Sequence, residues 1–159
     1  MQNAGVIDLS GVTPNWDKAL PASSRFVVLA AFTNDAVRDN ETGLVWELSP
    51  KTTPQNWSLA RFACAQSTVG GQRGWRLPFL PELASLLDPS VPFGALALPP
   101  GHPFTNVLPD YYWSASTVAD LSSAVWVVQL NDGISAASTL KTRSWQVWCV
   151  RGGMNADTY

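Results

Sequence analysis

The stretch "SWQVWCVRGG", Ser144 to Gly153, decides the fold of this chain. It places Cys149 among tryptophans and valines, a composition typical of a buried strand. The sequence contains only one other cysteine, Cys64, far earlier in the chain. Cys149 is therefore a reactive thiol, a metal ligand or one half of a disulfide, and each alternative implies a different protein.

The residues available around the two cysteines favour a disulfide. No Cys-x-x-Cys pair occurs, and the only histidine, His102, lies in the proline-rich "PPGHPF". A zinc site needs about four ligands, and a catalytic cysteine needs a basic partner to lower its pKa. A bond between Cys64 and Cys149 would contribute about 4 kcal/mol by closing a long loop. It would require an oxidising compartment; in a reducing one, both residues would be small buried hydrophobes.

Composition narrows the classes of protein. The 159 residues suit a single domain with a sizeable core, and 46% of them are hydrophobic. Only 14% are charged, against about 25% in an average domain, so the surface must be largely neutral and polar. The net charge of −2 and the scattered Lys and Arg residues argue against a nucleic-acid partner.

Two features bear on membranes and export. The longest apolar run, residues 26–32, is too short to span a bilayer, so no membrane insertion is expected. The first ten residues lack the basic and apolar regions of a signal peptide. Export would therefore use another route, or the signal lies before this sequence.

The N-terminal half predicts a strand, a hairpin and the first helix. Residues 1–24 form an irregular lead-in, residues 25–32 a buried strand, and residues 37–48 a hairpin that turns at 40–43. The acidic residues Asp35, Asp39 and Glu41 lie near this turn. Turn chemistry, with Gly43 supplying the unusual backbone angle, explains them better than a calcium loop.

Two helices are predicted in the middle of the chain. The first begins near Thr53, with Pro54 at its first position, and carries Trp57, Ala60, Arg61 and Cys64 on one side. The second fits residues 81–88, with Leu83, Leu86 and Leu87 inward. The glycine-rich residues 70–78 lack the Lys-Ser/Thr of a phosphate loop. Residues 89–110 form a long proline-rich loop of the kind that often serves as a binding lid.

The C-terminal third predicts three strands, at 111–116, 124–130 and 145–152. Alternation in the second strand directs Trp126, Val128 and Leu130 into the core, and Val125, Val127 and Gln129 toward solvent. A hairpin turn is expected at 131–133. The following small polar residues, 134–144, have no period and predict a loop. Six tryptophans are expected to be core or scaffold residues: Trp46, Trp57, Trp75, Trp113, Trp126 and Trp148.

These segments together resemble a known family. "RFVVL", "DNETGLVWE", "GGQRGWRLPFLPELASLLD", "YYWSAS", "AVWVVQLNDG" and "VWCVRGG" occur in this order, as in the bacterial Lcl C-terminal domain family. That family is named for a collagen-like surface adhesin and is placed in the C-type-lectin-like fold. The resemblance covers residues 25–153, leaving 154–159 as a tail, and implies an α+β domain with two helices around small antiparallel sheets. It also implies a bond from the first helix to the last strand, at the positions of Cys64 and Cys149.

The resemblance also bears on activity. Calcium-dependent sugar lectins carry a Glu-Pro-Asn loop, which is absent here, and the related formylglycine-generating enzyme needs additional cysteines. We therefore expect no metal, no cofactor and no catalysis. Members of the family often bind ligands on cell surfaces or phage particles, and some resemble the diversified targets of retroelements. The resemblance thus implies a recognition domain for a protein or glycan ligand, located extracellularly, on a cell surface or on a virion.

Two alternatives to this function stay open: a structural or assembly domain on a fibre, and a hydrolytic or formylglycine-generating-type enzyme. The expected ligand-binding residues project from the late strands and loops. The alternative interpretation is that these residues form an ordinary solvated surface. Trp145 is a special case: strand alternation places it with Val147 and Cys149, which are expected to face the core, but it lies at the exposed start of its strand. The predicted binding residues are Ser116, Thr117, Val127, Gln129, Asn131, Ser135, Ala137, Ser138, Arg143 and Trp145.

Overall fold

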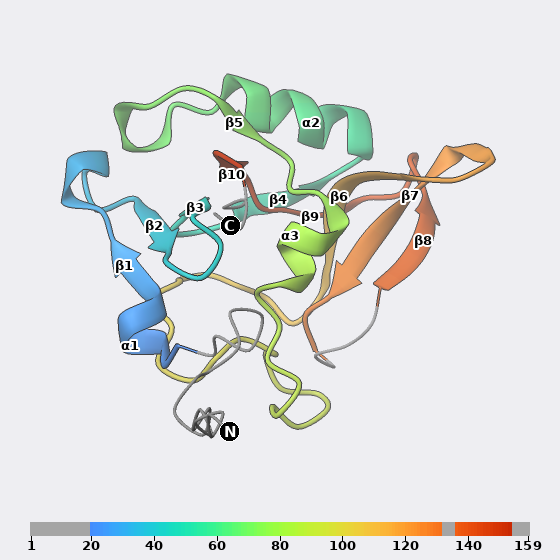
Figure 1. The fold of residues 1–159 in the computed structure, drawn as a ribbon. Helices are drawn as coiled ribbons and strands as arrows, with labels where there is room; N and C mark the ends of the chain where they lie inside the picture. The colour runs from blue at the N-terminus through green and yellow to red at the C-terminus, as the bar shows by residue number, and fades with distance from the viewer. Residues whose placement is uncertain (1–19, 132–135, 154–159) are drawn as a thin grey trace, which may run out of the picture.

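The structure, a computed structural model, describes residues 20–131 and 136–153 (Figure 1). In this part of the chain, two five-stranded sheets combine with three short α-helices. The α+β class predicted from the sequence is confirmed. Figure 1 shows α2 above the sheets, the loop of residues 89–110 below them, and the β6–β7–β8 portion at one side.

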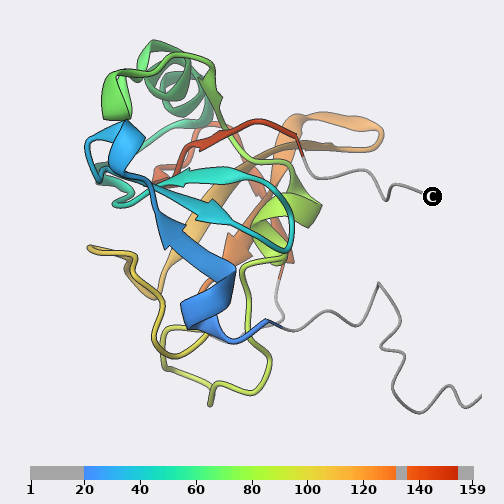
Figure 2. The same cartoon turned by 60° about the vertical axis from the view of Figure 1, so that its left-hand side comes forward.

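The first sheet has the strand order β1-β2-β3-β10-β5, with every pairing antiparallel. Its strands are β1 (Phe26–Val28), β2 (Ala36–Asp39), β3 (Val45–Glu47), β10 (Val150–Arg151) and β5 (Trp75–Arg76). Figure 2 brings this sheet to the front, with the β2–β3 hairpin beside β1. The predicted hairpin is confirmed, and Gly43 at its turn has a φ of 77°, which favours glycine.

The second sheet has the strand order β4-β9-β6-β7-β8. Its strands are β4 (Lys51–Gln55), β9 (Trp145–Val147), β6 (Tyr111–Val118), β7 (Leu121–Gln129) and β8 (Ala136–Leu140). All pairs are antiparallel except β6 and β9, which run parallel with Tyr112 opposite Gln146. A wholly antiparallel arrangement was expected, and this parallel pair corrects it.

The prediction of a loop over residues 134–144 is wrong for residues 136–140, which form β8. The backbone of this strand completes the outer hydrogen bonds of β7, with Ala137 opposite Val127 and Ser138 opposite Trp126. Pairing with an existing strand outweighs the weak β-propensity of alanine and serine. The expected turn at 131–133 lies largely outside the described residues.

The last predicted strand divides into two. β9 pairs in the second sheet and β10 in the first, with Trp148 and Cys149 between them. Val147 and Cys149 pack in one hydrophobic cluster, whereas Trp148 and Val150 pack in the other. The C-terminal segment therefore contributes one short strand to each sheet, in place of the single continuous strand that was predicted.

The helices are α1 (Ala22–Arg25), α2 (Trp57–Gln66) and α3 (Leu80–Ala84). Helix α2 begins later than predicted because Thr53 and Pro54 belong to β4, an edge strand where proline is tolerated. Asn56 provides the N-cap, its side chain accepting a hydrogen bond from the Leu59 N–H at 3.0 Å. Helix α3 is shorter than expected: Leu83 and Leu86 are buried as predicted, whereas Leu87 is half-buried.

The predicted buried strand at 25–32 is wrong in length and burial. Strand β1 ends at Val28, a one-turn helix follows at Ala30–Phe32, and both valines of β1 are exposed. β1 is an edge strand, so an apolar run here is not enclosed on both sides. Phe32 then packs against Gly70, where a Cβ atom would lie only 2.6 Å from the Phe32 Cβ.

Two hydrophobic clusters form the core, one on each side of the second sheet. In the first cluster, Leu83 and Leu86 pack with Tyr112 and Val128 of the sheet. In the second, residues of α2 pack against the opposite sheet face. Both faces of the central strands are therefore enclosed. The second cluster comprises Ala36, Trp57, Ala60, Cys64, Trp75, Leu77, Trp113, Val125, Val127, Val147 and Cys149.

Cys64 and Cys149 form a disulfide that joins α2 to the segment between β9 and β10. Their Cα atoms lie 5.4 Å apart, and both side chains are fully buried. This separation is normal for a disulfide. The structure confirms the predicted pairing, and the sequence contains no further cysteine.

We expect protein folded under oxidising conditions to show no free thiol when it is unfolded without reductant. Replacing both Cys64 and Cys149 by alanine should lower the free energy of unfolding by about 4 kcal/mol, since the unfolded chain loses its cross-link. Thiol titration and urea denaturation measure the two effects. Two titratable thiols, or an unchanged denaturation midpoint, would contradict the prediction.

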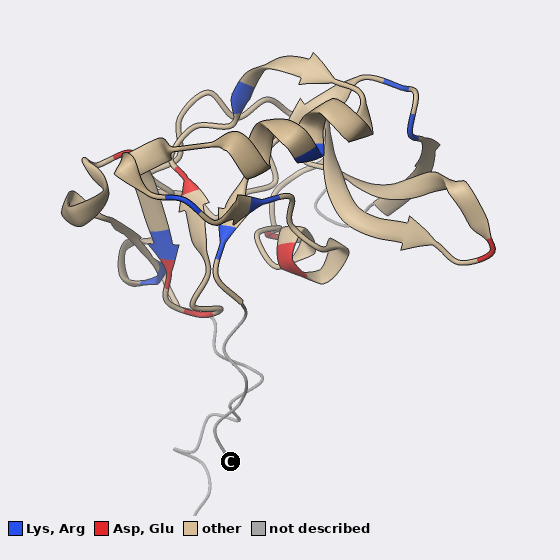
Figure 3. Ribbon diagram, turned by 90° about the horizontal axis from the view of Figure 1, so that it is seen from above, with Lys and Arg blue, Asp and Glu red and all other residues tan. Residues whose placement is uncertain are grey.

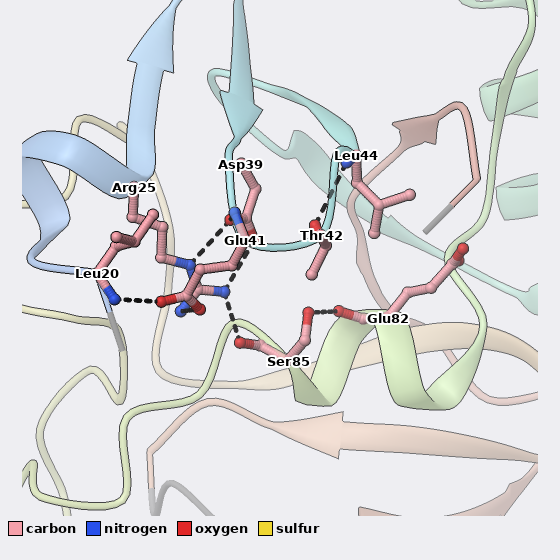
Figure 4. A network of polar contacts seen from close by, with 8 residues as sticks. All are labelled: Leu20, Arg25, Asp39, Glu41, Thr42, Leu44, Glu82 and Ser85. Atoms are coloured by element: carbon pink, nitrogen blue, oxygen red, sulfur yellow. Dashed lines mark hydrogen bonds and ion pairs between the residues drawn. The ribbon is translucent and has the colours of Figure 1, made fainter. Parts of the chain in front are cut away.

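Arg25 anchors the start of the domain through a buried network (Figure 4). Its Nε donates to Asp39 Oδ1 at 3.0 Å, and its Nη2 donates to Asp39 Oδ2 at 2.8 Å. Nη2 also donates to the Ser85 carbonyl at 2.7 Å, and Nη1 lies 3.2 Å from Glu41 Oε2. The network ties α1 to the β2–β3 turn and to the end of α3, so the acidic turn residues serve structure.

Arg25→Met should destabilise the protein by roughly 3–5 kcal/mol, because it leaves the buried Asp39 carboxylate without its partner. Arg38→Met is the matched control, since Arg38 is an exposed arginine on β2, the strand that carries Asp39. Chemical denaturation of the two variants tests this difference. Equal stabilities for both would show that the ion pair contributes little.

Candidate functional site

A partly exposed group of side chains lies at one end of the second sheet, and we call it the aromatic patch. It consists of Tyr111, Gln129, Ala137, Thr139 and Trp145, all half-buried. Tyr111 lies opposite Gln129 across β6 and β7, and the parallel pairing of β6 with β9 brings Trp145 beside Tyr111. The patch thus combines side chains from four strands.

The two aromatic rings of the patch hold each other in place. The ring centroids of Tyr111 and Trp145 lie 4.9 Å apart with an angle of 53° between the planes. Trp145 Nε1 donates to Thr139 Oγ1 at 3.2 Å, which links β9 to β8 across the sheet face. An aromatic surface fixed in this way loses little side-chain entropy when it binds a ligand.

Asp110 fixes the start of β6 beneath the patch. Its Oδ2 accepts from Gln146 Nε2 at 3.0 Å, and its backbone carbonyl accepts from the Leu130 N–H at 3.0 Å. Next to it, the Tyr112 hydroxyl accepts from the Leu108 N–H at 2.9 Å, and burial raises the pKa of Tyr112 to about 12. Tyr112 therefore stays neutral at physiological pH and acts as a scaffold.

The edge strand beside the patch is uncharged. β8 is an edge strand with no charged residue; its Ala136, Ser138 and Leu140 are exposed. Figure 3 shows charged positions scattered over the ribbon and absent from β8. A ligand here would meet aromatic rings, amide and hydroxyl groups.

Val127, a predicted binding residue, is buried, with 1% of its surface exposed. The prediction that Val125 and Val127 face solvent is wrong because β7 is an inner strand covered on both sides. Val128 and Leu130 are buried as predicted, whereas Trp126 on their side is only half-buried. Alternation is a guide to exposure only where one sheet face meets water.

The other predicted binding residues fall into four groups. Gln129, Ala137 and Trp145 belong to the aromatic patch, and Ser138 is exposed on the same edge strand. Thr117 and Arg143 are exposed, the first near the end of β6 and the second in the loop between β8 and β9. Ser135 lies outside the described residues.

Ser116 and Asn131 form the fourth group and instead make contacts within the fold. The Ser116 hydroxyl accepts from the Leu80 N–H at 2.8 Å and so holds the start of α3. The Asn131 carbonyl accepts from the Gly94 N–H at 2.7 Å, which attaches the long loop to the end of β7. Sequence reasoning missed Tyr111 and Thr139; Tyr111 was assigned to a strand, but only pairing shows that it adjoins Trp145.

His102 lies in the long loop of residues 89–110, which contains no helix or strand. Its ring centroid is 5.8 Å from that of Phe104, and its Nδ1 is buried without a hydrogen-bond partner among the described residues. Desolvation lowers the pKa of His102. The histidine thus packs as part of the loop, and no described hydroxyl group hydrogen-bonds it.

In the described ranges, no three side chains of His, Cys, Asp or Glu gather closely enough to hold a metal ion. The same part of the chain has no helix long and apolar enough to cross a membrane. The Glu47 carboxylate, a buried acidic group, accepts from Lys51 Nζ at 2.7 Å and from Ser67 Oγ at 2.8 Å. Both donors reach Oε1, whereas Oε2 is buried without a hydrogen-bond partner among the described residues.

Adding a chelator should leave the melting temperature unchanged. If an ion were bound, it would stabilise the folded state by mass action, and its removal would lower the melting temperature. Differential scanning calorimetry in EDTA, and again after adding excess calcium, checks this expectation. A lower melting temperature in EDTA that calcium restores would contradict it.

These features define a disulfide-linked α+β domain with two cores and an aromatic patch that extends from the inner strands of the second sheet to its edge strand β8. The model of the Lcl C-terminal domain family matches residues 35–151, and the chain belongs to this family. The resemblance noted from the sequence is thereby confirmed. A search of the curated proteins finds no match to this chain.

Proposed function

We propose that this protein is a non-catalytic recognition domain of C-type-lectin-like fold, which binds a protein or glycan ligand through the aromatic patch and the adjoining edge of β8. The single observation that carries the proposal is the fixed Tyr111–Trp145 pair, which lies half-buried on the inner strands β6 and β9 and is linked to the uncharged edge strand β8 through Thr139. Aromatic side chains with one apolar face and a polar tip are enriched at binding surfaces.

The chemistry of the patch suits a neutral ligand. Gln129 supplies both a donor and an acceptor, and Thr139 supplies a hydroxyl beside the indole of Trp145. The rings offer an apolar surface for a sugar ring or an apolar side chain. No ion pair involves a patch residue among those of the described chain, so binding should depend weakly on salt.

A diversified binding surface is part of the proposal. Ala136, Ser138 and Leu140 point away from the core at an edge, where surface substitutions usually change stability by less than about 0.5 kcal/mol. A reverse-transcriptase gene beside a near-copy of the region encoding residues 111–153, differing mainly at adenines, would support diversification. If the genome has neither the reverse-transcriptase gene nor the near-copy, the binding surface is that of a fixed adhesin.

A structural role in assembly is the second candidate, and the edge of β8 favours it. The opposite edge strand of this sheet, β4, carries Lys51 and Pro54, which discourage strand addition. β8 has neither a charge nor a proline. Light scattering distinguishes the two candidates, since an assembly domain would form an oligomer of defined size that Ser138→Lys disrupts.

The recognition proposal predicts that Gln129→Ala and Trp145→Ala each weaken ligand binding by about tenfold or more, as loss of a central contact does at interfaces. Cell-surface and glycan-array binding of the fluorescently labelled protein identifies the ligand, and titration of each variant measures the loss. Gln66→Ala, on an exposed position of α2, is the control.

Val127→Ala separates binding from folding. It should cost about 2 kcal/mol of stability, as truncation of a buried aliphatic side chain does, while folded protein keeps its affinity. If the patch variants bind as wild type and the Gln66 variant does not, the ligand surface lies elsewhere and the proposal is wrong.

A further inference from the structure

A cleft separates α2 from the segment that leads from β5 into α3. One wall is a single face of α2, formed by Trp57, Arg61 and Ala65 at successive turns. The other wall includes Leu77 and Phe79. Its volume of about 380 Å³ lies within the range of roughly 300–1,000 Å³ common for small-molecule sites. The cleft shares no lining residue with the aromatic patch.

Most polar groups along the cleft are already engaged. Trp57 Nε1 donates to the Ser114 carbonyl at 2.9 Å, and Trp75 Nε1 donates to the Gln72 carbonyl at 3.1 Å. These indoles therefore present mainly carbon to the cleft. A ligand body that contacts this wall must be apolar, because the indole donors cannot also serve it.

Arg76 is also engaged. Its two terminal nitrogens lie 2.8 and 2.7 Å from the two Glu82 carboxylate oxygens, and Nη2 donates further to the Gly152 carbonyl at 2.6 Å. Its guanidinium carbon lies 5.2 Å from the ring centroid of Phe79. Arg76 thus neutralises the acidic side chain closest to it along the chain and orients Phe79, which is 50% exposed at the rim.

Arg61 is different, because within the described residues it has neither an ion pair nor a hydrogen-bond acceptor for its side chain. Its guanidinium carbon lies 4.6 Å from the ring centroid of Trp57. This cation–π contact fixes the group beside the cleft and leaves its N–H donors free. Lys141 Nζ lies 4.4 Å from the same ring centroid and adds a second positive charge nearby.

Two positive charges, those of Arg61 and Lys141, therefore lie at the Trp57 side of the cleft. Figure 3, which looks down onto α2, shows basic positions on this helix and on the neighbouring β5 and β10 segments. The carboxylate of Glu82 is held by Arg76 at short range. An apolar cleft bordered by an unpaired guanidinium selects an anion with an apolar body, since a planar guanidinium binds a carboxylate through two parallel hydrogen bonds.

We propose that this cleft binds a small organic acid with a flat apolar body. The carboxylate pairs with Arg61, and the apolar body rests against Phe79 and Leu77. The cleft and the aromatic patch have no residue in common, so a variant can be made at one site without altering the other.

The test compares 2-naphthoate with its neutral counterpart 2-naphthamide, using isothermal titration calorimetry and backbone amide NMR shifts. The acid should bind and shift the amides of α2 and β5, whereas the amide should bind at least tenfold more weakly. Arg61→Gln should reduce the affinity for naphthoate by roughly 10- to 100-fold, the loss expected for a hydrogen-bonded charged group. It should leave the affinity for naphthamide unchanged.

Two variants serve as controls. Arg143→Gln removes an exposed arginine outside the cleft and should leave naphthoate binding intact, and Phe79→Ala should weaken acid and amide alike. A thermal melt confirms that Arg61→Gln is folded, as its exposed position predicts. Equal affinities for acid and amide, unchanged binding by Arg61→Gln, or no binding of naphthoate at millimolar concentration would each overturn the proposal.

Discussion

The segment Val147–Val150 is the constraint on which the rest of the structure depends. Successive side chains enter opposite cores: Val147 and Cys149 pack with α2, whereas Trp148 and Val150 pack with the β2–β3 hairpin and α3. Trp148 Nε1 also donates to the Glu47 carbonyl at 2.8 Å, and the Cys149 carbonyl accepts from the Glu47 N–H at 3.2 Å. Because this segment contributes side chains to both clusters, neither core is complete without it. The disulfide links this segment covalently to α2.

This arrangement limits where a ligand can bind. The two clusters enclose both faces of the middle of β6 and β7. Among the described residues, the open parts of the second sheet are its edge strands, the exposed far end of the β6–β7 hairpin at residues 117–123, and the half-covered area near Tyr111 and Trp145. A side chain there can vary without opening the core, whereas a change at Val127 removes packing from the middle of the domain. A closed core with substitutable positions at an edge would suit the recognition function proposed above.

Local sequence signals predicted those elements that depend on nearby residues. The β2–β3 hairpin follows from its turn chemistry, and the disulfide follows from the shortage of other ligands and thiols together with the family resemblance. Features set by distant pairing were not predictable. Residues 136–140 became a strand because β7 offered an unpaired edge, and the outward direction assigned to Val127 failed because α2 covers that face. The same reason explains the candidate site. Gln129 and Trp145 were named from the sequence, but strand pairing sets their neighbour Tyr111 opposite Gln129 on β7 and beside Trp145 on the parallel strand β9.

The two proposed sites differ in the chemistry that the same domain presents. The aromatic patch consists of uncharged side chains, and its indole N–H donates a hydrogen bond to Thr139. Shape and polar contacts would therefore decide which ligand it accepts. The cleft beside α2 has the positive charges of Arg61 and Lys141 over the Trp57 ring, so charge would decide. Trp57 connects them physically, because its Nε1 holds the Ser114 carbonyl on β6 while its ring forms the cleft wall. Any coupling between the sites would therefore pass through β6, the strand that carries Tyr111 at its other end.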